Sequence, residues 1–325
     1  MFFLVWYLIA SGKFDYRKLG NFFRQENLVF IFILFLLLII CNLLFSKRYQ
    51  IFLNILPKKI SFKTSLTIIM IGIFYNNFFP GGVGGDLIRI YYLKRKEKIS
   101  IPEGSAITLF DRFLGMSGLV FVAFFSMWLI SRHSDFGSTV LNENPFLLTL
   151  TIICPIVIIA VVLMLFLLKI PKVYKLLELV LSKLLFGSKM ISFMNTFQII
   201  VKNTKTLLIT FAICIFGHII TLISISIVAY ILYPDIQSVY ATMAVAGVAI
   251  LTSVVPITPG NIGVTEGVAD ILYSAFGIRD GAGATIFALW RVITALFSLT
   301  GGIFYLYYGS GQSIKADMKK DQEGS

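Results

Sequence analysis

The fold of this chain is decided by residues 76–89, which read NNFFPGGVGGDLIR. Pro80 comes directly after an apolar run, residues 66–79, and is followed by four glycines and two opposite charges, Asp86 and Arg89. Proline removes a backbone donor and glycine favours irregular backbone, which lipid tolerates only where protein or a water-filled cavity covers it. The stretch therefore predicts a broken, re-entrant element rather than a plain spanning helix.

A second copy of this break follows later in the chain. PGGVG at residues 80–84 corresponds to PGNIG at residues 259–263, and an acid follows each, Asp86 in the first and Glu266 in the second. The same offset, 259 − 80 = 179 residues, brings Arg112 onto Arg291. Paired breaks in two halves of a chain are the best sequence indication of a transporter's binding site. The residues predicted to form the backbone of the two hairpins are Pro80, Gly81, Gly82, Gly84, Gly85, Pro259, Gly260 and Gly263.

Composition identifies the class of protein. Of the 325 residues 58% are hydrophobic and 14% charged, whereas soluble domains have about 45 to 50% and about 25%. The net charge is +12, but the basic residues lie in short loops between apolar runs. That pattern favours membrane topology and contact with anionic lipid heads at the cytoplasmic face over nucleic-acid binding. The three cysteines have no paired spacing, so we expect no disulfide and no metal site.

Hydropathy predicts the membrane segments. Spanning helices are expected at residues 28–45, 105–131, 145–168, 206–232 and 284–308. Residues 1–10 are apolar but shorter than the roughly 20 residues that a span needs, and they resemble a clipped first membrane helix. Residues 47–63 are basic and amphipathic and are expected to lie in the interface. Residues 169–205 carry seven lysines and predict two interfacial helices, with a short membrane hairpin as the alternative.

The distribution of basic residues predicts the orientation. If the loops at residues 46–65, 89–98 and 169–205 and the C-terminal tail are cytoplasmic, they hold 20 Lys or Arg against 6 on the other side. The first break then enters from the cytoplasm and the second from outside. The predicted fold is thus an all-α polytopic protein of the cell membrane, a single domain over residues 1–325 with an inverted repeat. Each half, at about residues 1–131 and 145–308, holds three spanning helices and one re-entrant helical hairpin, and a polar cytoplasmic tail follows at 309–325.

Seven ionisable side chains lie in or beside segments at membrane depth. At roughly 3 kcal/mol each their unpaired burial would cost on the order of 20 kcal/mol, so they must pair or face water. The predicted headgroup groove consists of Asp86, Arg89, Asp111, Arg112, Glu266 and Arg291. Arginine's planar fork suits a lipid phosphate, and the acids would hold a cationic headgroup or pair with those arginines.

A structural role is the competing interpretation of the same side chains. Asp111 and Arg112 would then pin helices together, while Arg89 would snorkel to the cytoplasmic lipid heads. Asp270 would face the outer interface. His218, in the middle of a predicted span, is expected to be a hydrogen-bonded polar residue between helices rather than a proton relay.

The two breaks also resemble a known family. NNFFPGGVGGD at residues 76–86, the Asp111-Arg112 pair and PITPGNIGVTE at residues 256–266 are similar to the membrane domain of the lysylphosphatidylglycerol synthase/flippase family, over about residues 21–308. The resemblance implies translocation of a lipid rather than of a solute. The chain departs from full-length members in having no synthase domain after Tyr308, so the resemblance implies that it does not make lysyl-lipid by itself.

We therefore expect a flippase-like lipid transporter that moves a phospholipid or another polar lipid headgroup between leaflets. It is expected to have no catalytic residues and no cofactor, to bind membrane phospholipids, and to work beside a separate lipid-modifying synthase. Two alternatives stay open. One is a membrane-embedded enzyme or accessory subunit for lipid or polyprenyl headgroup modification, and the other is a small-solute secondary transporter.

Overall fold

The structure is a computed structural model that describes residues 18, 20, 22–76, 83–133, 145–182, 187–234, 236, 239–252, 263–278 and 280–309. Within these residues every regular element is a helix. The helices are η1 (Gln25–Asn27), α3 (Leu28–Leu53), α4 (Phe62–Asn76), α5 (Val83–Glu97), α6 (Ile101–His133), α8 (Pro145–Leu167), α9 (Pro171–Ser182), α10 (Gly187–Lys202), α11 (Thr204–Leu232), α12 (Val239–Leu251), α13 (Val264–Ala275) and α14 (Ala282–Gly309). Several predictions lie outside the described residues: the first helix at 1–10, the tail from 310, and Pro80, Gly81, Gly82, Pro259 and Gly260.

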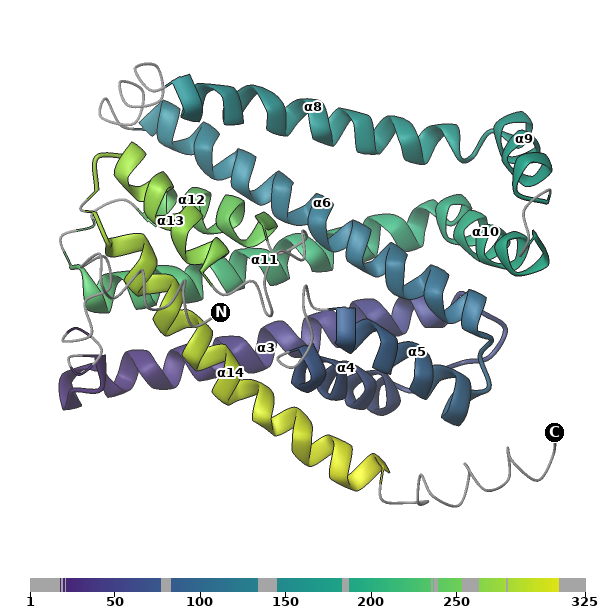
Figure 1. Cartoon of the computed structure of the whole chain (residues 1–325), viewed down its shortest axis with the longest axis horizontal. Coiled ribbons are helices and arrows are strands. Elements are labelled where there is room, and N and C mark those ends of the chain that lie inside the picture. Colours follow the sequence, from purple (N-terminus) through teal and green to yellow (C-terminus); the bar gives the residue numbers. More distant parts are fainter. Residues whose placement is uncertain are drawn as a thin grey trace.

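The long helices confirm a multi-pass membrane protein. In the described parts of the chain four helices are long and apolar enough to cross a bilayer, at Gln25–Leu53, Ile101–Ile130, Thr204–Leu232 and Ala282–Tyr308. Their bounds match the predicted spans to within a few residues at most ends. Helix α8 has almost the bounds predicted for the span at residues 145–168, although it is not one of these four, and Figure 1 shows it running beside α6.

Helix α3 ends eight residues later than the predicted span, which stopped at Phe45. The prediction that residues 47–63 lie in the interface is therefore wrong for their first part. Arg48, Tyr49 and Phe52 are buried against the rest of the protein, because the buried face of α3 continues through them. Residues 169–205 form two short helices as predicted, α9 and α10, which Figure 1 places at one end of the molecule.

The short helices occupy opposite ends of the molecule. In Figure 1 α4 and α5, on either side of the first break, lie in the half of the molecule that also holds α9 and α10. Helices α12 and α13, on either side of the second break, lie in the other half, whereas the long helices α6 and α11 pass through both. Each pair of short helices has its own core: Tyr49, Phe52 and Phe110 centre the first, and Tyr273 and Phe287 belong to the second.

The helices pack crosswise between the two halves. Helix α3 packs on α11, α4 packs on α14, and α12 packs on α6. Small residues allow these approaches, as is usual between membrane helices. A Cβ added at Gly301 of α14 would lie 2.1 Å from the Met70 carbonyl oxygen of α4, and one at Gly247 of α12 would lie 2.6 Å from the Ala123 Cβ of α6.

Hydroxyl side chains at membrane depth satisfy their donors within their own helix. Ser126, Ser224 and Ser226 each donate to the carbonyl four residues earlier, at 2.8 to 2.9 Å. Such back-bonding spares a buried hydroxyl the cost of an unmade hydrogen bond. These helices can therefore carry serine without building a polar channel.

The glycine contacts give the first prediction. Gly301→Ala and Gly283→Ala should each destabilise the protein by about 1 to 3 kcal/mol, because the new methyl group would overlap backbone atoms of the neighbouring helix. Gly267→Ala is the matched control. Nothing lies within 4 Å of its added Cβ, and alanine should stabilise helix α13 there by up to about 1 kcal/mol. Thermal unfolding in detergent measures all three, and equal melting temperatures for Gly301→Ala and Gly267→Ala would contradict the close packing.

Candidate functional site

The first break is followed by a carboxylate held between two arginines. Asp86, in the first turn of α5, lies 3.2 Å from Nε of Arg112 on α6 and 3.5 Å from Nη1 of Arg89. A carboxylate is favourable there because the N-terminus of a helix carries partial positive charge. The Arg112 side chain is 33% exposed and that of Asp86 is 18% exposed, so solvent or a ligand can reach the pair. The interpretation that Arg89 snorkels to the lipid heads is wrong, since its side chain turns inward and lies over the Tyr49 ring.

Glycine brings this carboxylate into position. A Cβ on Gly85 would lie 2.4 Å from the Gly72 carbonyl oxygen of α4, so only glycine lets α5 approach α4 so closely. The Gly85 amide donates to Oδ1 of Asn76 at 2.8 Å. The amide of this predicted hairpin glycine thus holds the last residue of α4 against the first turn of α5, and Gly84 beside it is also buried.

The second break is followed by an equivalent pair. Glu266, in the first turn of α13, accepts from Nε of Arg291 on α14 at 2.5 Å. Its other carboxylate oxygen accepts from the Gly263 amide at 2.8 Å, which caps the helix. Gly263 has φ of 86°, a left-handed conformation that glycine adopts without strain. Glu266 is 3% exposed in its side chain and Arg291 is 29% exposed.

The two pairs thus occupy corresponding places. In each half an arginine on a long helix pairs with the acid in the first turn of the short helix after the break: Arg112 with Asp86 of α5, and Arg291 with Glu266 of α13. The halves still differ in charge, because Val268 stands at the position that corresponds to Arg89. Two arginines and one aspartate give the first site a formal charge of +1, whereas Glu266 and Arg291 cancel.

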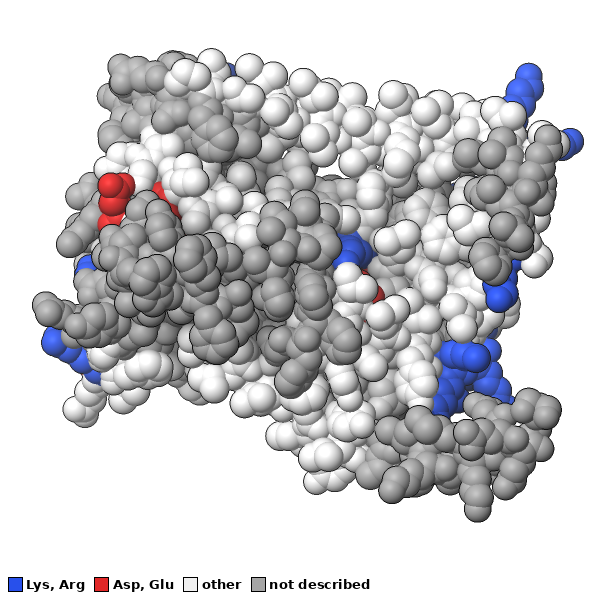
Figure 2. Space-filling model, in the orientation of Figure 1, with Lys and Arg blue, Asp and Glu red and all other residues white. Residues whose placement is uncertain are grey.

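A cavity of about 190 Å³ lies beside the first pair. Residues from both halves line it: Arg112, Gly115, Met116 and Leu119 of α6, His218 of α11, and Ile250 and Leu251 at the end of α12. Arg291 does not line this cavity, so the structure does not bring both arginines into one described groove. Figure 2 shows a small group of basic and acidic atoms near the middle of one face, whereas most other charged atoms lie towards the two ends.

Asp111 belongs to a separate, sealed cluster. It lies 2.7 Å from Nε of Arg48, and the two side chains are only 6% and 8% exposed. Arg48 also contacts the Cys214 sulfur at 3.2 Å. His218 Nε2 lies 2.8 Å from the Gly115 carbonyl oxygen, so it is a hydrogen-bonded polar residue between helices, as expected. The predicted placing of Asp111 in the headgroup groove does not agree with these contacts, which match the structural interpretation.

The burial of Arg48 was not predicted, because this residue follows a lysine at the end of an apolar run and was counted among the loop cations. The missed signal is its spacing: Leu34, Leu38, Cys41, Arg48 and Phe52 are all buried and recur at intervals of three, four or seven residues along α3. Asp270 also differs from its prediction. It does not face the outer interface but is 2% exposed and accepts from the Gly281 amide at 2.7 Å, which fixes the turn between α13 and α14.

The sealed cluster gives the second prediction. Arg48→Met should lower the free energy of unfolding by about 3 to 5 kcal/mol, because it leaves the Asp111 carboxylate buried without its cation. The double variant Arg48→Met with Asp111→Leu should recover most of that loss, since it leaves neither charge buried alone. Lys58→Met is the control, because Lys58 is 48% exposed in its pair with Glu97 and such pairs contribute about 0 to 1 kcal/mol. Unfolding in detergent tests this. If Arg48→Met is as stable as Lys58→Met, the pair of Asp111 and Arg48 does not stabilise the fold.

Comparison with known proteins identifies the family. The profile of the family described as "Lysylphosphatidylglycerol synthase TM region" matches residues 1–302. A UPF0104 membrane protein of Methanocaldococcus jannaschii is 23% identical over 279 residues, covering 83% of this chain and 82% of the relative. Another, from Pyrococcus horikoshii, is 25% identical over 301 residues, covering 87% and 88%. No solved structure matches the chain. The chain therefore belongs to the family of the lysylphosphatidylglycerol synthase membrane region, as the residues around its two breaks predicted.

Proposed function

We propose that this protein is a flippase-like lipid transporter, which carries a polar headgroup between leaflets through a groove between two re-entrant hairpins while the acyl chains stay in the bilayer. The observation that carries the proposal is the acid–arginine pair beside each break, with Arg112 opening onto a cavity lined by both halves. The family, named for a lipid synthase, supports a role with lipids. We propose transport without catalysis.

The order of the helices supports an inverted repeat. Long, short, break, short, long describes both α3 to α6 and α11 to α14. The packing of α4 on α14 corresponds to that of α12 on α6 when the halves are exchanged. Because α4 and α5 approach the middle of the molecule from one end and α12 and α13 from the other (Figure 1), we infer two hairpins that enter the membrane from opposite sides. Inverted-repeat transporters bind their cargo where such broken helices meet.

The charge at the first pair supports an anionic group as the cargo's recognised part. Asp86, Arg89 and Arg112 sum to +1, so a phosphate diester would neutralise the site. Without cargo, Asp86 holds the Arg112 guanidinium in place. A phosphate entering the cavity would take over hydrogen bonds from Arg112, whose planar fork binds two oxygens at once. A headgroup amine would in turn bind the acid that is released.

The second pair supports a stepwise path. Arg291 is exposed to a similar degree as Arg112, but its partner Glu266 is also held by the Gly263 amide. Arg291 is thus the group at the second pair that can turn to a ligand, while Glu266 keeps its place at the helix end. We infer that the phosphate meets Arg112 and Arg291 in turn as it passes from one hairpin to the other.

We propose the cell membrane as the location, with the C-terminus cytoplasmic. Arg48 and Arg89 turn inward and leave the count of loop cations, so the bias becomes 18 (20 − 2) against 6, which still favours this orientation. Membrane phospholipids, anionic ones at the cytoplasmic face, and a separate lipid-modifying synthase are the proposed partners.

Topology is the third prediction. Single cysteines at Lys94 and Lys175 should react with a membrane-impermeant thiol reagent only from the cytoplasmic side, and single cysteines at His133 and Asp280 only from outside. The background for labelling should carry Cys41→Ser, Cys154→Ser and Cys214→Ser together, and it must first be shown to fold. Labelling of Lys94 and Asp280 variants from the same side would contradict an inverted repeat.

Lipid transport is the fourth prediction. Arg112→Lys and Arg291→Lys should each fold normally and slow the movement of labelled phospholipid across liposome membranes by about tenfold or more, because lysine keeps the charge but loses the two-pronged contact. Arg24→Lys is the matched control, since Arg24 pairs with Glu26 at an exposed site.

The same liposomes separate the alternatives. Normal lipid transport by both folded variants would remove the arginines from the mechanism, and a fall in melting temperature in step with transport would return them to the scaffold. Uptake of a small solute without lipid movement would replace the proposal with secondary transport, and formation of a modified lipid would replace it with catalysis.

A further inference from the structure

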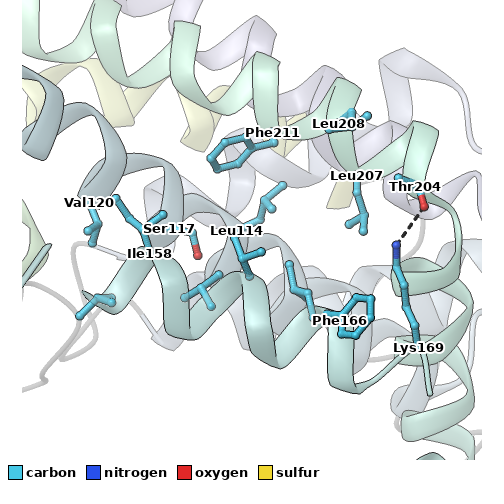
Figure 3. Close-up of a pocket in the computed structure, with 14 residues that line it drawn as sticks. Leu114, Ser117, Val120, Ile158, Phe166, Lys169, Thr204, Leu207, Leu208 and Phe211 are labelled. Atoms are coloured by element: carbon cyan, nitrogen blue, oxygen red, sulfur yellow. Dashed lines mark hydrogen bonds between the residues drawn. The ribbon is translucent and has the colours of Figure 1, made fainter. Parts of the chain in front are cut away.

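A second cavity lies between α6, α8 and α11, away from the paired charges. Its volume is about 370 Å³, within the range of small-molecule sites. Figure 3 shows its walls, which are mostly aliphatic and aromatic side chains, with Phe166 and Phe211 among them. The hydroxyl of Ser117, between the apolar side chains of α6, already donates to the Phe113 carbonyl at 2.9 Å. The lining of this cavity therefore suits an apolar ligand.

This cavity is separate from the one beside Arg112. Leu114, Ser117 and Val120 of α6 line it, whereas Gly115, Met116 and Leu119 line the other. At about 100° per residue the two sets point roughly 150° apart around α6. A ligand in this cavity would thus lie on the far side of α6 from the paired charges.

The cavity has a polar, basic end. Nζ of Lys169, after the end of α8, donates to the Thr204 hydroxyl at 3.0 Å, and both residues line the cavity (Figure 3). Among the described residues no carboxylate lies within ion-pair distance of Lys169. Thr204 is also the first residue of the 29-residue helix α11, whose N-terminus favours an anion. Lys172, Lys202 and Lys205 nearby in sequence are exposed.

We propose that this cavity binds one acyl chain of an anionic glycerophospholipid, with the lipid phosphate against Lys169, Thr204 and the N-terminus of α11. An apolar cavity that ends at a lysine with no acid partner in the described part of the chain complements an acyl chain joined to a phosphate. The neighbouring lysines add attraction for an anionic headgroup over a zwitterionic one. The bound lipid is resident rather than cargo, so this inference does not rest on the proposed transport.

The lipid would also fill the space between two helices. Among the described elements α8 has its main helix contact with α6, and the cavity separates it from Leu207 and Phe211 of α11. An acyl chain there would join α8 to α11 through apolar contacts. The resident lipid is thus a structural ligand that holds α8 in the bundle.

The fifth prediction tests this site by native mass spectrometry of the whole protein in mild detergent. Phosphatidylglycerol and phosphatidylcholine with identical chains are added in turn. One phosphatidylglycerol should stay bound at about tenfold lower concentration than phosphatidylcholine requires. Lys169→Glu should abolish that preference, whereas Lys94→Glu, the same charge change at an exposed lysine of α5, should keep it.

A second variant tests the cavity itself. Ser117→Phe should fill it and remove the bound phosphatidylglycerol, whereas Ala212→Phe, on an exposed position of α11 that does not line the cavity, should retain it. Equal retention of the two lipids would mean ordinary contact with bulk lipid and would overturn the proposal. Equal effects of Lys169→Glu and Lys94→Glu on the preference for phosphatidylglycerol would also overturn it. The same holds if Ser117→Phe dissociates a protein dimer but leaves the lipid bound. Lipid movement is not measured, so failure here is distinct from failure of the transport proposal.

Discussion

A charge at membrane depth must have a partner, and the arrangement of this protein depends on how three acids find theirs. Asp86, Asp111 and Glu266 each pair with an arginine from another helix, so every pair also ties two helices together. Exposure separates their roles. The Arg48 side chain is 8% exposed, and burial so complete suits a fixed joint, whereas Arg112 and Arg291 keep about a third of their side chains open.

Glycine also contributes to the arrangement of the helices, because it sets how closely they approach one another. Gly85 brings the first turn of α5 against α4, and Gly263 supplies the left-handed turn that starts α13. Both turns place an acid at a helix N-terminus, where the backbone dipole favours it. In each half a glycine at the start of a short helix thus lies within a few residues of the acid that the helix positions.

Much of this was predictable from sequence, because hydropathy and the repeat are strong local signals. The long helices, the paired arginines and the two short helices after α8 were all foreseen. Arg48, Asp111 and Asp270 were not, since their partners come from elements distant in sequence or from a backbone amide, and local composition says nothing of which faces meet. Arg48 shows the difficulty: its charge predicts a loop, and only its place on the buried stripe of α3 predicts the interior. The cavity between α6, α8 and α11 has no sequence signal, because it is the gap left by three separately apolar faces.

The crosswise packing of the short helices has a mechanical consequence. Helix α4 packs on α14 and α12 packs on α6, so a short helix of each half is attached to a long helix of the other half. A rigid tilt of one half against the other would then act as a lever and move the short helices of both halves together. Coupled movement of that kind would need no separate linker, because it follows from which long helix each short helix packs against.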